Sequence, residues 1–268
     1  MTRVCIVLAL ALVANACATS SMPFHAPPGI AAELAPSGTL RAAINFGNTI
    51  LASKDPATGE ARGVSVALSR ELSRQLGVPL ALVTYDAAGK VTDNATTGAW
   101  DIAFVAIDPK RAVDMDYTAP YVLIEGAFVV PQGSPIRVND DVDRAGVRVV
   151  AAKGSAYDLY LARELKHATI VNVATSQEVV PAMAAQGMEA GAGVKQQLEA
   201  SARTTPGVRV LDGRFMVIQQ AMATPKGRPA GARYLAAFVE EMKASGFVDA
   251  ALRRHGIDGA AVAPPAAR

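Results

Sequence analysis

Short apolar segments alternate with amphipathic segments along the chain, and this alternation limits the possible folds more than any other feature. Residues 40–44, 80–85 and 101–107 have the apolar composition of buried strands. Between the first two, residues 64–76 carry leucines and valines at helical spacing, which is the stripe of an amphipathic helix. Residues 90–97 predict a second helix. The order strand, helix, strand, helix, strand predicts a parallel α/β sheet.

A second α/β unit follows, and two further strands lie between the units. The expected strands of this unit are 147–151, 169–173 and 208–211, and its helices are 155–165, the segment after a Thr175/Glu178 capping box, and 195–202. Strands at 125–130 and 216–223 connect the units. Two closing helices, 230–244 and 247–255, have no strands of their own. We therefore expect them to pack on the first unit, so that the chain crosses between two lobes twice, with a ligand between the lobes.

The N-terminus predicts export. Arg3 gives a short positive segment, residues 4–14 are apolar, and Ala14-Asn15-Ala16 has the small-x-small pattern of a cleavage site. The apolar stretch is too short to span a membrane. We expect a signal peptide over 1–16 and a location in the periplasm or cell envelope. Cys17 directly follows the cleavage site and is a candidate for lipidation, so a lipid-anchored and a free periplasmic form both remain open.

Composition and cysteine content exclude several classes of protein. The chain is 51% hydrophobic with a formal net charge of +2, which argues against a disordered protein and against a nucleic-acid binder. Its cysteines, Cys5 and Cys17, lie in or beside the signal peptide, so the mature domain has no disulfide and no thiolate metal site. Motifs of serine hydrolases, phosphate-binding loops and zinc proteases are absent. We expect no cofactor, no metal and no catalytic residue.

Six short motifs, in order, resemble one protein family over residues 34–257. The motifs are Gly38-Thr39-Leu40-Arg41, Gly63-Val64-Ser65-Val66-Ala67-Leu68, Gly98-Ala99-Trp100-Asp101-Ile102-Ala103, Asp108-Pro109-Lys110-Arg111, Asp116-Tyr117-Thr118-Ala119-Pro120-Tyr121 and Lys153-Gly154-Ser155-Ala156. The chain resembles bacterial extracellular solute-binding proteins of family 3, the periplasmic components of polar amino-acid ABC transporters. The resemblance implies a monomeric solute-binding protein that delivers its ligand to a membrane ABC permease.

The fold that the resemblance implies is α/β and two-lobed, of the type II-like periplasmic binding protein class. It has two parallel or mixed sheets with helices on both faces, joined by a two-strand hinge. On this basis residues 34–127 and 222–257 form lobe 1, and residues 128–221 form lobe 2. Residues 17–33 are expected to be a flexible tether, and residues 258–268 a disordered tail.

The resemblance also implies a carboxylate site formed by Arg111 and Ser155. A guanidinium matches a carboxylate with two parallel hydrogen bonds, which are strong when water is excluded. Ser155 follows Gly154 at a predicted helix start, where backbone N–H groups and a hydroxyl bind anions. The alternatives are a surface Arg111 paired with Asp114 or Asp116, and a Ser155 that only caps its helix.

Departures from the family pattern place amine recognition in doubt. The family's Asp that holds the ligand's α-ammonium is missing from the segment Glu189-Ala190-Gly191-Ala192-Gly193-Val194. The stacking aromatics fall at Asn48 and at Ala88 or Gly89, and the family's threonine is Asp108. An ammonium partner would therefore have to be Asp108 or Glu189. We infer a small carboxylate-bearing solute whose α-amino group is not assured.

Further candidates lie at the ends of predicted strands. Asn45, Phe46, Asn48 and Ala106 are expected near the pocket, and Phe46 fits a core position equally well. Gly191 and Gly193 permit a close approach, after which Lys195, Gln196 or Gln197 reaches the cleft or begins a solvated helix. Either Gln219 or Gln220 can reach the cleft from the return strand.

Two other functions share this scaffold. One is an exported lyase of the cyclohexadienyl-dehydratase type, which would need a general acid in a dry cleft, and Asp108 and Glu189 are the candidate carboxylates. The other is a ligand-binding accessory protein of an envelope complex. A solute-binding protein that closes around its ligand remains the first hypothesis.

Overall fold

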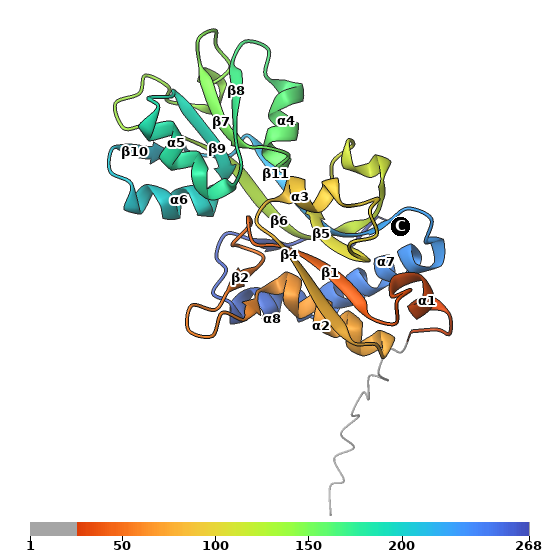
Figure 1. The fold of residues 1–268 in the computed structure, drawn as a ribbon. Helices are drawn as coiled ribbons and strands as arrows, with labels where there is room; N and C mark the ends of the chain where they lie inside the picture. Colours follow the sequence, from red (N-terminus) through yellow and green to blue (C-terminus); the bar gives the residue numbers. More distant parts are fainter. Residues whose placement is uncertain (1–25, 268) are drawn as a thin grey trace, which may run out of the picture.

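The computed structural model describes residues 26–267, which Figure 1 shows as two groups of elements joined by two long strands. The expected signal peptide over 1–16, the lipidation candidate Cys17 and the tether up to residue 25 lie outside the described residues. Among residues 26–267, no helix has the length and apolar character needed to cross a membrane.

Lobe 1 is built on three parallel strands, as the alternating pattern predicts. β1 (Leu40–Asn45) lies between β4 (Leu80–Tyr85) and β5 (Ile102–Ala106). α2 (Val64–Leu76) follows β1 and buries its valine and leucine stripe, and α3 (Ala88–Asp93) follows β4. The lobe also contains the smaller elements α1 (Ile30–Leu34), β2 (Ser53–Lys54), β3 (Ala61–Arg62) and the 3-10 turn η1 (Arg111–Val113).

Lobe 2 repeats this arrangement with a second set of parallel strands. β7 (Arg148–Ala152) lies between β9 (Ala190–Val194) and β8 (Thr169–Val173). Its other elements are the 3-10 turns η2 (Asn139–Asp141) and η3 (Ser176–Glu178), α4 (Ala156–Glu164), α5 (Val179–Ala185), α6 (Lys195–Thr204) and β10 (Val208–Val210). Thr175 precedes η3, Glu178 ends it, and α5 follows directly. The Thr175 hydroxyl donates to the Glu178 carboxylate at 3.0 Å.

Two long antiparallel strands, β6 (Met115–Pro131) and β11 (Met216–Pro225), join the lobes. β11 pairs with β5 of lobe 1 and β6 pairs with β9 of lobe 2, so one hydrogen-bonded sheet runs through the molecule in the order β4-β1-β5-β11-β6-β9-β7-β8. β6 begins ten positions before the expected start at residue 125. It passes through Pro120, which pairs with Ala221 beside register shifts in β11. Proline is tolerated there because a bulge does not require its missing N–H.

The closing helices pack on lobe 1, as expected. α7 (Pro229–Ala244) contacts α1, β6 and β11, and α8 (Phe247–Arg254) contacts α2 and α7. Phe238 and Val239 of α7 are fully buried. Figure 1 shows both helices in blue beside the red and orange N-terminal elements. Within residues 26–267, elements from the start and the end of the chain thus pack together.

The described parts of the expected tether and tail are structured, which differs from the expectation. α1 begins within the tether range, and the Glu33 carboxylate accepts a hydrogen bond from Gly231 N at 2.7 Å. In the tail, β12 (Ala261–Val262) pairs antiparallel with β6, and Ala263 is buried. Short Ala- and Pro-rich segments carry little pattern of their own, and tertiary pairing orders them here.

Candidate functional site

A cavity lies where the two lobes meet, and both lobes and a connecting strand line it. The space open to the centre of a water molecule is about 40 Å³, which is more than one water needs. Its polar lining residues come from β1 and the loop after it, α2, η1, the β7–α4 turn, α4, η3, α6 and β11. They are Asn45, Asn48, Ser65, Arg111, Lys153, Ser155, Tyr157, Ser176, Gln197 and Gln220.

Arg111 is buried in this cavity, with 4% of its surface exposed. Its Nη1 donates to Ala106 O at 2.8 Å and its Nη2 donates to Gly154 O at 2.7 Å, while its Nε is buried without a partner. In residues 26–267 no carboxylate forms an ion pair with it, so the alternative pairing with Asp114 or Asp116 is wrong. Burial lowers the pKa of the guanidinium, because the charged form is desolvated. The cavity thus holds a cation that forms no ion pair within residues 26–267, and the attraction of the Asp108 carboxylate offsets only part of the effect of burial on its pKa.

Ser155 caps α4, and its surroundings differ from the expected anion cradle. Its hydroxyl oxygen accepts from Asp158 N at 3.1 Å, and its own N–H donates to Ala152 O. The N–H of Gly154 donates to the Asp158 carboxylate at 2.7 Å. Two of the backbone donors expected to face an anion are therefore already used, and the hydroxyl proton of Ser155 remains as a donor. Gly154 instead presents its carbonyl oxygen to Arg111.

Two amide side chains end in the cavity with unpartnered oxygens. Asn48 Oδ1 and Gln197 Oε1 are buried and lack a hydrogen-bond partner. Gln197 reaches across from α6, and its Nε2 donates to Gly47 O at 3.0 Å, which fixes its oxygen as the free end. Buried acceptors without partners are rare in folded proteins, and a bound ligand is one way to satisfy them.

The two carboxylates nominated as ammonium partners are both engaged elsewhere. Asp108 is buried beside the cavity but does not line it; its carboxylate accepts from Lys110 N at 2.8 Å and pairs with Arg163 of α4 at 2.9 Å. Glu189 lies before β9 and pairs with Arg148 at 2.8 Å. That pairing lowers the pKa of Glu189 to about 2. Neither residue is placed to meet a solute in the cavity, which corrects the expectation for both.

The remaining candidates divide between the cavity and other surroundings. Asn45 and Ala106 line the cavity as expected. Phe46 does not: its ring packs on the core and lies 5.3 Å from the Lys54 ammonium. Lys195 pairs with Glu125 at 3.2 Å and does not line the cavity. Gln197, an alternative candidate on the same segment, lines it. Gln219 is exposed, because alternate residues of a strand face opposite ways, and Gln220 lines the cavity instead.

Gly191 and Gly193 serve packing rather than a ligand. A Cβ on Gly191 would lie 2.9 Å from Val179 Cγ1, and one on Gly193 would lie 3.0 Å from Leu198 Cδ2. The sequence reasoning also missed Ser65, Tyr157 and Ser176. Ser65 shares a 3.3 Å hydrogen bond with Tyr121, and Tyr157 shares one of 2.8 Å with Ser176. Ser65 lies within the family motif at residues 63–68, and Tyr157 directly follows the motif at residues 153–156. Their positions in or beside these motifs were the sequence signal that could have identified them.

The lobes touch through backbone at the edge of the cavity. A Cβ on Gly89 of α3 would lie 2.9 Å from Lys153 O, and one on Gly154 would lie 2.8 Å from Gly89 Cα. Gly154 also has a φ of 70°, a conformation that side chains disfavour. The resemblance places the family's second stacking aromatic at Ala88 or Gly89. At Gly89 this contact leaves no room for a ring, whereas Ala88 lines the cavity.

Comparison with known proteins agrees with the fold. The model of the bacterial extracellular solute-binding proteins, family 3, matches residues 51–257. A solved binding component of an ABC transporter from Wolinella succinogenes, complexed with lysine, is 22% identical with a TM-score of 0.69, over 81% of this chain and 95% of that one. No curated protein matches the chain.

Two further solved structures have the same architecture. A solute receptor for L-cysteine from Neisseria gonorrhoeae is 21% identical with a TM-score of 0.74, over 86% of this chain and 94% of that one. An ancestral amino-acid-binding protein, a precursor of cyclohexadienyl dehydratase, is 22% identical with a TM-score of 0.70, over 83% and 97%. The structural similarity to these proteins shows the fold, and the family model matches most of the chain. The chain therefore belongs to the bacterial extracellular solute-binding proteins, family 3.

Proposed function

We propose that this protein is the extracytoplasmic solute-binding component of an ABC transporter, and that it binds a small carboxylate-bearing solute between its lobes. The observation that carries the proposal is Arg111. It is buried, its Nε has no partner, and within residues 26–267 it forms no ion pair, because Asp108, the carboxylate whose charge acts on it, pairs with Arg163. An unpaired buried cation is costly, and an anionic ligand that accepts from it removes that cost.

Lobe closure is the mechanism we propose for capture. Residues 34–127 and 222–257 would move as lobe 1 and residues 128–221 as lobe 2, with β6 and β11 as the hinge. The groups that line the cavity come from both sides, so a solute bound to one lobe gains contacts when the other closes. Arg111 of lobe 1 already donates to Gly154 O of lobe 2. The residue proposed to bind the carboxylate of the solute is therefore also one that holds the lobes together.

The closed form is the shape that a membrane permease would recognise. Similar solved structures are described as amino-acid-binding components of ABC transporters, which supports the same partner here. We propose that the protein acts as a monomer outside the cytoplasm. Cys17 is a candidate lipid attachment site, and the anchored and free forms both suit this function.

The lining of the cavity favours binding over catalysis. Elimination of water from a carboxylated ring needs a general acid close to the substrate. The cavity is lined by amides, hydroxyls, apolar groups and two cations, and its lining includes no Asp, Glu or His among residues 26–267. Asp108 and Glu189, the candidate acids, pair with Arg163 and Arg148. We therefore propose a protein that is not an enzyme.

Replacing Arg111 tests the proposal. Arg111→Ala should weaken binding of a carboxylate solute at least about tenfold, the scale of a lost charge-assisted hydrogen bond. The measurement is isothermal titration of the mature domain with the best carboxylate from a thermal-shift screen. Arg137→Ala, an exposed arginine away from the cavity, is the matched control and should bind as the unmodified protein does.

The fold of Arg111→Ala must be checked, because the change removes a hydrogen bond from Ala106 O and another from Gly154 O. A circular dichroism spectrum and a melting transition like those of the unmodified protein establish that it folds. A folded Arg111→Ala with unchanged affinity would contradict the carboxylate assignment.

A further inference from the structure

We propose that the solute is a small carboxylate that carries a neutral hydrogen-bond donor, such as a hydroxyl, in place of an α-ammonium group. Its class is the small 2-hydroxy acids. The proposal rests on the proposed function, because it concerns the same cavity, and it narrows the solute to a class distinct from amino acids. The juxtaposition that carries it is a buried arginine and two unpartnered amide oxygens in one cavity without a carboxylate.

The charge in the cavity is positive. The charged side chains in its lining are Arg111 and Lys153, and within residues 26–267 no Asp or Glu joins them there. A zwitterion placed in this cavity would balance Arg111 with its carboxylate, but no carboxylate of the lining within residues 26–267 would balance its ammonium. Lys153, the other cation of the lining, is an exposed residue. A buried ammonium without a carboxylate partner is costly, because it loses water and gains no opposite charge.

The nearby groups that otherwise receive an ammonium are occupied. Asp108 pairs with Arg163, and the Asp158 carboxylate accepts from Gly154 N and from Asn172. Backbone carbonyls could also receive an N–H, but Ala106 O and Gly154 O both accept from Arg111. A protonated amine would therefore meet only uncharged acceptors, such as the free amide oxygens of Asn48 and Gln197, and no carboxylate of the lining within residues 26–267 would balance its charge.

The free acceptors suit an uncharged donor. Asn48 Oδ1 and Gln197 Oε1 are buried and unpartnered, and an amide oxygen forms a full hydrogen bond with a hydroxyl group. A free donor suits a carboxylate, because Arg111 Nε is buried and lacks a partner. A donor for an anion and acceptors for a neutral group thus line the same small cavity.

The size of the cavity favours small members of this class. It offers about 40 Å³ to the centre of a water molecule, and the Gly89–Gly154 backbone contact closes one side. Small 2-hydroxy acids such as glycolate, lactate and glycerate have counterparts among the amino acids in which the hydroxyl is replaced by an ammonium group. Glycine, alanine and serine are these counterparts. Within each pair, the charge at the 2-position of the solute changes while its shape stays nearly the same.

The experiment is isothermal titration of the mature domain with the three matched pairs: glycolate and glycine, L-lactate and L-alanine, L-glycerate and L-serine. We expect at least one hydroxy acid to bind about tenfold or more tightly than its amino-acid partner. The variant Asn48→Asp places a carboxylate in the cavity with almost no change of size. It should reverse the preference within that pair, and Gln197→Glu serves the same purpose if Asn48→Asp does not fold.

The outcomes separate this inference from the proposed function. If an amino acid binds as tightly as its hydroxy-acid partner or more tightly, and Arg111→Ala abolishes that binding, the inference is overturned and the proposed function stands. If a folded Arg111→Ala binds the hydroxy acid with unchanged affinity, the carboxylate assignment fails. If no member of any pair binds, this inference is overturned. If Asn48→Asp and Gln197→Glu both fold and neither moves the preference toward the amino acid, the charge argument is overturned.

Discussion

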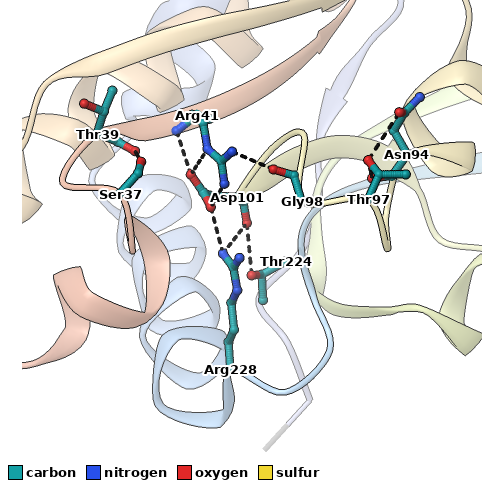
Figure 2. Close-up of polar contacts among 9 residues, drawn as sticks. All are labelled: Ser37, Thr39, Arg41, Asn94, Thr97, Gly98, Asp101, Thr224 and Arg228. Atoms are coloured by element: carbon teal, nitrogen blue, oxygen red, sulfur yellow. Dashed lines mark hydrogen bonds and ion pairs between the residues drawn. The ribbon is translucent and has the colours of Figure 1, made fainter.

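At the scale of single residues, Asp101 shows how one carboxylate holds the start of a strand. Its side chain is fully buried, and Figure 2 shows it between Arg41 of β1 and Arg228, which precedes α7. Arg41 donates to it from Nε at 2.9 Å and from Nη2 at 2.8 Å, and the backbone N–H of Arg41 donates to it at 3.1 Å. Arg228 adds an ion pair of 3.1 Å. The cluster connects β1, the start of β5 and the segment that begins the closing helices.

Lobe 2 contains the same arrangement with longer side chains. Arg148 of β7 donates to Glu189 from its backbone N–H, Nε and Nη2, and its Nη2 also donates to Gly187 O. In lobe 1 the corresponding carbonyl is that of Gly98, which accepts from Arg41. In each lobe, an arginine on the first strand therefore holds a carboxylate at the start of the third. The two pairs differ in burial, since the side chain of Glu189 is 35% exposed and that of Asp101 is buried.

This difference predicts unequal costs for two matched substitutions. Asp101→Asn should lower the free energy of unfolding by about 3 kcal/mol, because two arginines lose their buried partner. Glu189→Gln should cost less than about 1 kcal/mol, because both members of that pair reach water. Urea denaturation of both variants at neutral pH measures the comparison. If both variants lost the same free energy of unfolding, burial would not determine how much these ion pairs stabilise the fold.

At the scale of secondary-structure elements, the C-terminal segment is an integral part of lobe 1. β12 pairs with Val122 and Leu123 of β6, and the next residue donates to Tyr121 O at 3.1 Å. The Lys243 ammonium of α7 donates to Pro264 O at 2.9 Å. The segment thus covers β6 where that strand passes through lobe 1, and it adds hydrogen bonds to a strand that both lobes share.

Removal of this segment should destabilise the fold. Truncation of residues 258–268 should lower the free energy of unfolding by about 1–3 kcal/mol, because ladder hydrogen bonds are lost and buried polar groups of β6 lose their partners. Chemical denaturation measures the loss. Truncation of 267–268 alone is the matched control and should leave stability within about 0.5 kcal/mol of the full chain. If the longer truncation had the same free energy of unfolding as the full chain, residues 258–268 would not contribute to the stability of the fold.

At the scale of the whole molecule, closure depends on contacts that join the lobes around the cavity. Arg111 bonds Gly154, Gln197 bonds Gly47, and the Asp108–Arg163 pair joins the loop before η1 to α4. Backbone also meets backbone across the lobes, where Gly89 approaches Gly154. A side chain at Gly89 would oppose the closed form without entering the core of either lobe.

Gly89→Ala should therefore weaken solute binding and leave folding intact. Its Cβ would lie 2.9 Å from Lys153 O, and relief of such overlap costs about 1–3 kcal/mol, which applies only when the lobes meet. The expected loss of affinity is about tenfold or more by titration, with an unchanged melting transition without ligand. Gly133→Ala is the matched control, since a Cβ there meets nothing within 4 Å. Unchanged affinity in Gly89→Ala would show that the lobes need not approach this closely.

The sequence alone determined the elements and their order, because hydrophobic periodicity is a local property. The strands at β1, β4, β7 and β8 and the stripe of α2 follow from spacing within a few residues. The motif order also placed Arg111 and the β7–α4 turn at one site, and both line the cavity. Local pattern could not show that β6 extends back through Pro120 or that β12 joins the sheet, since a partner strand distant in sequence decides both.

Only the tertiary structure decided which candidate side chains face the cavity. Gln219 and Gln220 differ by one position, and the pleat of β11 turns one outward and the other inward. Asp108, Glu189 and Lys195 are chemically suitable, but each has a closer partner that spacing does not reveal: Arg163, Arg148 and Glu125. A charged group takes its role from the charges nearest to it in space, and those neighbours are fixed only when the chain has folded.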